Sequence, residues 1–330
     1  MDLDQPVRDH LILRTLPGAV DYLAEELRSV DGGAPPVLAR TRNSLRIAWT
    51  GPLRELAAVR YFDVLGIPAQ DLGDVRRSID EGVLSLLEQP IRFRVGAIGD
   101  DRWDVRDELE AALGWANSAD DWSVNVDRMG DELIAQVGPL FLTRRFGELE
   151  RMPASTNPVV AAVMVRLAKI EPGDVVLDPF CGAGTLLTLA GEQTPGLTLI
   201  GNDLNPSWLE LTRANLERRG LQGQLIEGDA AHLPLDDGSA DRIVSNIPFG
   251  KRIGSHGGNV DLYPAALREI ARLMHSRSRA VLLTDDKRLF TQSVQRTPLI
   301  RVVKEIMLEQ HGGLHPTAYV ISKRGSSRRR

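Results

Sequence analysis

The feature that most constrains the fold is a regular alternation of apolar runs with helical segments in the second half of the chain. The apolar run Val175-Val176-Leu177 ends in Asp178, and a glycine turn and a helix at 185–191 follow it. The same order repeats, with strands predicted at 197–203, 224–227, 242–246 and 280–284 and helices at 157–169, 206–219 and 262–274. Such alternation is typical of a mostly parallel sheet with helices on both faces. It predicts a doubly wound, Rossmann-like α/β domain that ends in an antiparallel pair.

The first half of the chain mixes helices and strands without a regular order. Strands or strand pairs are predicted at 11–15, 37–50, 91–95 and 122–137, and helices at 19–30, 53–65, 80–87 and 105–113. This mixture is typical of an α+β domain. A chain of 330 residues is expected to hold two domains. The predicted division is a smaller α+β region at 1–145, an α/β domain at 146–324 and a basic tail at 325–330.

Composition excludes several classes of protein. Apolar residues make up 42% of the chain, which is enough for a packed core and argues against disorder. Neither a run of about 18 uncharged apolar residues nor an N-terminal signal segment is present in the sequence. The single cysteine, Cys181, cannot form an internal disulfide, and the histidines lack metal-ligand spacing. A cytoplasmic protein without a membrane span or a metal is expected, and the sequence leaves its oligomeric state open.

The net charge of −5 conceals two halves of opposite sign. Residues 1–150 hold 17 Arg, no Lys and 27 acidic residues, a balance of −10, whereas residues 151–330 have a balance of +5. A basic second half is compatible with an acidic partner such as a nucleic acid, and equally with a solvated surface and a basic tail.

The turn after the first predicted strand of the α/β domain has the composition of a ligand-binding loop. Gly182 and Gly184 let the backbone approach a ligand closely, and a helix begins behind them. A dinucleotide fingerprint would need a third glycine at 187, where the chain has leucine. The carboxylate of Asp178 would repel a pyrophosphate and suits a ligand with an amino group. These residues favour S-adenosylmethionine, which has an amino acid moiety and no phosphate.

Two further acids follow the next two strands. Asp203 can accept hydrogen bonds from ribose hydroxyls, and Asp229 is expected to reach an adenine amine, with Ala230 beside it. Three acids at three successive strand ends favour the methyl donor more than any one of them does. A nicotinamide dehydrogenase stays open on this evidence, because it also uses an acid after its second strand.

The fourth strand ends in Asn246-Ile247-Pro248-Phe249, which suits methylation of a base amine. The Asn246 side-chain oxygen and the Ile247 carbonyl can accept the hydrogens of an exocyclic amine and stabilise the positive charge that develops on it. Pro248 restricts the backbone that aims this carbonyl. Phe249 offers a flat face to a base that has left its stack. The alternative is an ordinary strand end with Phe249 in the core.

Several runs resemble the THUMP-domain RNA guanine-N2 methyltransferases. They are Asp178-Pro-Phe-Cys-Gly-Ala-Gly-Thr185, Asn246-Ile-Pro-Phe-Gly-Lys-Arg-Ile-Gly254 and Asp261-Leu-Tyr-Pro264, with Asn157 to Ala162 before them and Gly312 to Leu314 and Ala318 to Val320 after them. The resemblance covers about 140–324 well and extends more faintly to Leu13–Gly18 and the strand pair near 122–145. One departure is Ile247, which stands where many amino-methyltransferases have a first proline.

The resemblance implies a THUMP module that holds an RNA end while the Rossmann-like domain methylates guanine N2, most often in tRNA. It implies that residues 246–249 bind the amine. It also implies that the strand-end acids and the turn residues next to them bind the methyl donor. The full donor set is Asp178, Phe180, Gly182, Gly184, Thr185, Asp203, Leu204, Asp229, Ala230 and Asn246. RNA contacts are expected from Lys251 and Arg252 next to the amine-binding set, and from Arg144 and Arg145 in the front half.

Two alternatives to a tRNA guanine-N2 methyltransferase stay open on the sequence. One is an adenine-N6 methyltransferase of DNA or another RNA, which would use the same amine-binding set. The other is an RNA-binding protein without catalysis, which would bind RNA but not the methyl donor.

Overall fold

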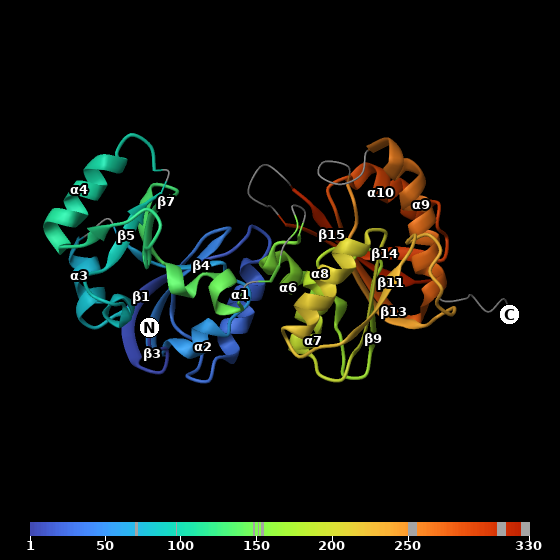
Figure 1. Cartoon of the computed structure of the whole chain (residues 1–330), viewed down its shortest axis with the longest axis horizontal. Helices are drawn as coiled ribbons and strands as arrows, with labels where there is room; N and C mark the ends of the chain where they lie inside the picture. The colour runs from blue at the N-terminus through green and yellow to red at the C-terminus, as the bar shows by residue number, and fades with distance from the viewer. Residues whose placement is uncertain are drawn as a thin grey trace. The chain divides into compact units, whose positions relative to one another are not determined.

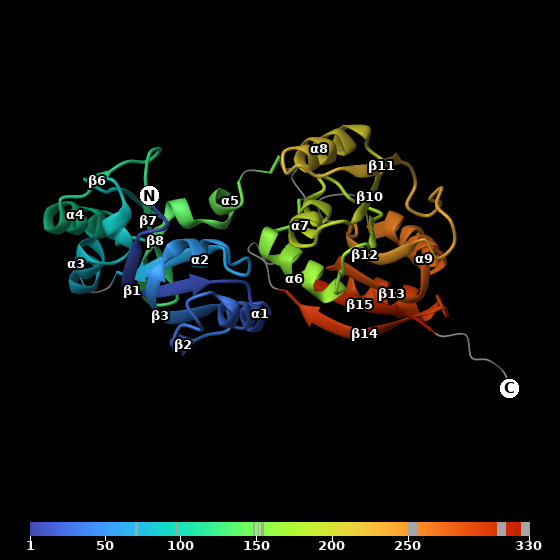
Figure 2. The same cartoon turned by 90° about the horizontal axis from the view of Figure 1, so that it is seen from below.

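The computed structural model describes residues 1–69, 72–96, 98–147, 149–150, 152, 155–249, 256–308 and 315–324, excepting the side chains of 256–258. The chain divides into two compact units, Met1–Glu148 and Leu149–Arg330. Figures 1 and 2 show a sheet with helices in each of them. In the described part of the chain, every helix is too short or too polar to cross a membrane.

The described residues of the first unit form one mixed sheet of eight strands in the order β2-β3-β1-β4-β8-β7-β5-β6. Its elements are β1 (Pro6–Arg14), α1 (Val20–Glu26), η1 (Leu27–Ser29), β2 (Val37–Arg40), β3 (Ser44–Pro52), α2 (Leu53–Ala57), β4 (Val64–Pro68), α3 (Leu72–Asp80), η2 (Val83–Leu86), β5 (Arg92–Val95), α4 (Arg102–Leu113), β6 (Ala116–Asn117), β7 (Val124–Met129), β8 (Glu132–Val137), η3 (Gly138–Leu140) and α5 (Leu142–Arg145). β5 pairs in parallel with β6 and β7, and the other pairs are antiparallel. The α+β class predicted for this half is confirmed.

The second unit has a sheet of seven strands, counted over its described residues, in the order β11-β10-β9-β12-β13-β15-β14. Its elements are α6 (Pro158–Ala168), β9 (Val175–Asp178), α7 (Thr185–Gln193), β10 (Thr198–Asp203), α8 (Pro206–Glu217), β11 (Gly223–Glu227), β12 (Ala240–Asn246), α9 (His256–Leu273), β13 (Met274–Thr284), α10 (Lys287–Gln295), β14 (Ile300–Met307) and β15 (Thr317–Lys323). The first five strands of that order are parallel, and β15 and β14 complete the sheet in antiparallel fashion. The predicted Rossmann-like fold and its terminal antiparallel pair are confirmed.

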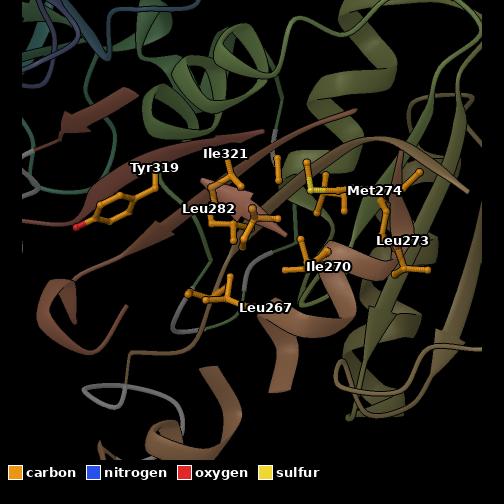
Figure 3. Close-up of a cluster of buried hydrophobic side chains, with 14 of the residues drawn as sticks. Leu267, Ile270, Leu273, Met274, Leu282, Tyr319 and Ile321 are labelled. Atoms are coloured by element: carbon orange, nitrogen blue, oxygen red, sulfur yellow. The ribbon is translucent and has the colours of Figure 1, made fainter. Parts of the chain in front are cut away.

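One buried cluster of the second unit lies where α9 and α10 cover the sheet, and the buried helix α6 also packs against the sheet. Figure 3 shows Leu267 and Ile270 of α9 packed toward Leu282 of β13 and Ile321 of β15. Apolar residues on the two sides of such an interface are removed from water together, and this burial is the main favourable term in folding. Because Tyr263 belongs to the same buried cluster, the packing also fixes the part of α9 that adjoins the loop after β12.

The predicted helix at 53–65 is wrong over most of its length. Only α2, Leu53–Ala57, is an α-helix, and Val64 begins the strand β4. All of β4 is buried, because it lies inside the sheet between β1 and β8. A short, continuously apolar run gives the same signal in a buried strand as in a buried helix, so its periodicity could not separate them.

Three other boundaries also differ from the prediction. The helix expected at 80–87 is replaced by α3, which ends at Asp80, and by a 3-10 turn at Val83–Leu86, with the extended residue Gly82 between them. α9 begins at His256 and carries Pro264 in its interior. β13 begins at Met274, six positions before the expected start at 280.

Arg145, which was predicted to contact RNA, has a structural role instead. Its guanidinium lies 3.7 Å from the centre of the Phe62 ring and donates four hydrogen bonds to backbone carbonyls. The acceptors are Leu140, Ala57, Val59 and Phe62, at 2.8, 3.1, 2.5 and 2.7 Å. The side chain therefore ties α5 to the loop between α2 and β4, and its donors are occupied within the protein.

We predict that Arg145→Ala lowers the free energy of unfolding of the first unit by at least about 3 kcal/mol, because it leaves several carbonyls without their donor. The exposed neighbour Arg144 is the matched control, and Arg144→Ala should change stability by less than about 0.5 kcal/mol. Urea unfolding followed by circular dichroism measures both. Equal stabilities of the two variants would contradict the structural role of Arg145.

Candidate active site

A cavity of about 680 Å³ opens at the carboxyl ends of the parallel strands of the second unit. Ligands bind at this edge in open α/β sheets, because the loops that leave neighbouring strands diverge there. The cavity is lined by the segments that follow β9, β10, β11 and β12, together with residues before α6 and on α9. Its volume is in the range of small-molecule sites.

Asp178 forms the buried floor of the cavity at the end of β9. It is 1% exposed, and its Oδ1 accepts hydrogen bonds from Ser245 Oγ at 2.6 Å and from the Phe180 N–H at 3.1 Å. Burial raises the pKa of Asp178 to about 7, and the charge of Asp203 nearby raises it further. A carboxylate in this environment gains from a cationic ligand, because such a ligand restores the stabilisation that burial removes.

The glycine turn brings the ends of β9 and β10 together. Gly182 has φ +53° and donates its N–H to Asp203 Oδ2 at 3.0 Å. The other Asp203 oxygen accepts the Asn205 N–H at 3.0 Å. Asp203 thereby orders both loops while it lines the cavity, and burial raises its pKa.

Gly184 has a different role from the predicted one. It does not line the cavity; it caps the start of α7 with φ +73°. A Cβ at this position would lie 2.7 Å from Thr212 Cγ2. The glycine is therefore needed for close packing of the turn against α8, rather than for contact with a ligand.

The remaining predicted donor residues line the cavity at different depths. Leu204 is 70% exposed, and Asp229 is also exposed, with its Oδ1 accepting the Ala231 N–H at 2.9 Å. Ala230 is buried beneath them. Phe180 and Thr185 also line the cavity.

Asn246 lines the cavity and carries an acceptor without a partner. Its Nδ2 donates to Thr156 Oγ1 at 3.1 Å, which fixes the orientation of the amide. The opposite atom, Oδ1, is buried and has no hydrogen-bond partner among the described residues. Buried polar atoms are nearly always paired, so this oxygen marks a place where a ligand donor would fit.

The loop after Asn246 is held by two hydrogen bonds. Ile247 donates its N–H to the Leu283 carbonyl at 3.1 Å, and its side chain is buried in the core. Proline could not make that bond, which gives the departure at this position a physical reason. The Pro248 carbonyl accepts a hydrogen bond from Tyr263 Oη of α9 at 2.8 Å. Phe249, half-buried, lines the cavity beyond them.

The structure therefore brings most of the predicted site residues of the second unit into one cavity. Of the four predicted RNA contacts, Arg144 and Arg145 belong to the first unit. Lys251 and Arg252 lie outside the described residues. Arg144 is exposed on the first unit, with its guanidinium 5.2 Å from the Trp122 ring centre. Cys181 is a buried thiol whose pKa burial raises, which suits packing rather than nucleophilic chemistry.

Sequence reasoning missed several residues of this site, including the following four. Thr156 orients Asn246, Trp208 lines the cavity from α8, Tyr263 anchors the loop, and Asn259 lines the cavity from α9. Only Tyr263 lay in a quoted motif. The others gave no signal, because their contacts join segments that are far apart in the sequence.

The model of a methyltransferase family, described as RMKL-like, matches residues 148–316. The chain belongs to the RMKL-like methyltransferase family. The match covers the whole Rossmann-like sheet up to β14, including the cavity and the loop that carries Asn246.

Named relatives are similar over part of this chain. A tRNA (guanine(6)-N2)-methyltransferase of Thermus thermophilus is 33% identical over 204 residues, which are 61% of this chain and 60% of the relative. The tRNA (guanine(6)-N(2))-methyltransferase THUMP3 of Mus musculus is 32% identical over 185 residues, which are 52% of this chain and 37% of the relative. The matched region thus spans little more than a third of the mouse protein.

Solved structures are similar over nearly the whole methyltransferase chain. TrmN from Thermus thermophilus superposes with a TM-score of 0.75 at 28% identity, over 96% of this chain and 99% of that one. A possible methylase from Clostridium difficile superposes with a TM-score of 0.71 at 15% identity, over 96% of this chain and 98% of that one, a likeness that shows the fold alone. In the described part of the methyltransferase, no group of three or more His, Cys, Asp or Glu residues is placed to hold a metal ion.

We predict that Gly184→Ala lowers the free energy of unfolding of the methyltransferase domain by at least about 2 kcal/mol, from backbone strain and the clash with Thr212. Gly173 is the matched control, because it also has a positive φ, of +89°, but nothing lies within 4 Å of an added Cβ. Gly173→Ala should cost only the strain, about 1 kcal/mol. Chemical denaturation measures the difference, and equal losses would show that packing against Thr212 contributes nothing.

Proposed function

We propose that the protein is an S-adenosylmethionine-dependent RNA methyltransferase that acts on an exocyclic base amine, namely guanine N2 in tRNA. The observation that carries this proposal is the buried, unpartnered Oδ1 of Asn246 beside a cavity whose neighbouring strand ends carry acidic residues. One site then holds an acceptor for the amine, together with carboxylates for the amino acid moiety and the ribose of the methyl donor.

The residues of the cavity fit S-adenosylmethionine better than a dinucleotide. Asp178 is buried with a raised pKa, so it gains from the ammonium group of an amino acid moiety. Asp203 can accept hydrogen bonds from ribose hydroxyls, and Leu204 and Trp208 offer apolar surface to an adenine ring. The described lining residues include three carboxylates and no basic side chain, so they would repel a pyrophosphate.

The loop after β12 fits the acceptor amine. When bound, S-adenosylmethionine supplies a methyl group that its sulfonium has already activated. Asn246 Oδ1 can accept one amine hydrogen and the Ile247 carbonyl another, which directs the nitrogen lone pair at the methyl group. As the new bond forms, the amine becomes positively charged, and both oxygens stabilise that charge until a proton leaves. Phe249 can stack on the extruded base.

The choice of RNA and of guanine rests on the relatives. Two of them are named as tRNA guanine-N2 methyltransferases, and a human relative is named as a U6 snRNA guanine-N2 methyltransferase. The charge balance of +5 in residues 151–330 is compatible with a polyanionic substrate. We propose that residues 1–145 are a THUMP-like module that holds RNA, that Lys251, Arg252 and Arg144 contact phosphates, and that the protein acts in the cytoplasm.

The proposal is tested by methylation of bulk tRNA with S-adenosylmethionine that carries a labelled methyl group, followed by digestion and mass identification of the nucleoside. Label in N2-methylguanosine is the expected result. Label in N6-methyladenine would assign the enzyme to adenine. RNA binding without S-adenosylhomocysteine binding in calorimetry would indicate a non-catalytic RNA-binding protein, and binding of reduced nicotinamide cofactor would favour a dehydrogenase.

We predict that Asn246→Ala lowers kcat by about 100-fold or more and changes the affinity for S-adenosylhomocysteine by less than twofold, because the amine loses an oriented acceptor. Thr156→Val, which removes only the hydroxyl that orients Asn246, should lower kcat by about tenfold. Thr156→Ser keeps that hydroxyl and is the matched control. Equal activity of the valine and serine variants would contradict the orienting role of Thr156.

We predict that S-adenosylhomocysteine binding depends on pH through Asp178. Its pKa is about 7 in the free protein, and an ammonium group beside it favours the ionised form. The affinity is therefore expected to be constant above pH about 7, where Asp178 is ionised. Below that pH it is expected to fall by up to about tenfold per pH unit, because the protonated carboxyl must release its proton when the ammonium group binds. Calorimetry from pH about 5.5 to 8 measures this, and Asp178→Asn should bind weakly with a flat profile. An unchanged slope in that variant would assign the titration to another group.

A further inference from the structure

Asn259 carries an unpartnered polar group among the residues that line the cavity, as Asn246 and Asn202 do, and it lies on α9 rather than at the end of a donor strand. It is 1% exposed. Its Nδ2 is buried and has no hydrogen-bond partner among the described residues. An amide N–H group in a low-dielectric site without an acceptor is unfavourable, so a ligand acceptor is expected to complete it.

The packing of α9 fixes which part of the cavity Asn259 faces. Residues four apart on a helix lie on the same face, and Asn259 precedes Tyr263 by four. Tyr263 Oη donates to the Pro248 carbonyl at 2.8 Å, and Leu262 between them also lines the cavity. This face of α9 is therefore held against the loop that carries Asn246, whereas the donor acids follow β9, β10 and β11.

The unpartnered atoms of Asn246 and Asn259 are complementary to a base edge. Asn246 Oδ1 is an acceptor and Asn259 Nδ2 is a donor. The guanine amine N2 is a donor, and of its two ring neighbours only N3 is an acceptor, since N1 carries a hydrogen. The acceptor of Asn246 thus matches the N2–H group of guanine, and the donor of Asn259 matches N3, the next atom along the same edge.

We propose that Asn259 is a base-positioning residue whose Nδ2 donates a hydrogen bond to N3 of the guanine whose N2 is methylated. The inference rests on the proposed function. The acceptors of Asn246 and Ile247 hold only the amine group and leave the ring free to tilt about it, whereas a contact at N3 holds the ring itself. Asn259 then sets the direction in which the amine lone pair points, without contacting the methyl donor.

The test measures kcat and KM on unmodified tRNA and, in parallel, the affinity for S-adenosylhomocysteine and the melting temperature. Asn259→Ala is expected to lower kcat/KM by at least about tenfold, the value of one neutral hydrogen bond. Asn259→Asp is nearly isosteric but presents only acceptors to N3, and it should lower kcat/KM further, by about 100-fold. Val260→Ala is the matched control, because Val260 is the exposed neighbour on the same turn, and it should stay within twofold of wild type.

A second measurement places 3-deazaguanosine, which lacks the N3 acceptor, at the methylated position of the tRNA. The kcat/KM of wild type should fall on this substrate by about the same factor by which Asn259→Ala lowers it on normal tRNA. The kcat/KM of the variant should fall little further on the 3-deazaguanosine substrate, because either change alone already removes the one hydrogen bond. Fully multiplicative losses would show that Asn259 does not contact N3 and would overturn the proposal.

Three other outcomes also overturn it. They are a kcat/KM of Asn259→Ala within twofold of wild type, a parallel loss of S-adenosylhomocysteine affinity, and failure of both Asn259 variants to fold, since the last two assign Asn259 to the structure of the cavity. Absence of N2-methylguanosine with wild type is a different result. It would remove the proposed function itself, and it is read from wild type alone.

Discussion

The hydrogen bond from Ser245 Oγ to the buried carboxylate of Asp178 is the interaction on which the site depends. It joins the ends of β9 and β12, the two neighbouring strands at the centre of the sheet, at a distance of 2.6 Å. Asp178 belongs to the proposed donor half of the cavity, and Ser245 directly precedes Asn246 in the amine half. Because the two halves share this buried contact, the methyl group and the amine can be held in a fixed relation, which is the main requirement of a direct transfer.

The described loop after β12 is supported by other segments at Asn246, Ile247 and Pro248. Thr156 fixes the Asn246 amide, Leu283 accepts the Ile247 N–H, and Tyr263 donates to the Pro248 carbonyl. These supports come from the segment before α6, from β13 and from α9. Asn246 Oδ1 and Asn259 Nδ2 are among the atoms of the cavity lining that have no partner in the described residues, and we assign both to the substrate. Preorganised polar groups stabilise developing charge without a cost of reorganisation.

The acidic first unit uses several of its arginines internally. Arg14 pairs with Asp63, Arg46 with Glu132 and Arg40 with Asp21, and Arg145 binds backbone carbonyls. A net charge therefore says little about which cations are available to RNA. Docking by this unit would depend on local groups such as Arg144 rather than on a general positive field.

The sequence by itself determined the Rossmann-like class and most residues of the cavity, because strand-end residues of a parallel sheet converge wherever the strands are. Asp178, Asp203, Asp229 and Asn246 could be assigned to one edge from the order of strands alone. The tertiary structure decided what depends on contacts between distant segments. It paired Thr156 with Asn246, put Asn259 of α9 in the cavity lining, left Gly184 outside that lining and bound Arg145 to backbone carbonyls. It also made 64–68 a buried strand, since a short apolar run is equally compatible with a helix until its neighbours β1 and β8 are in place.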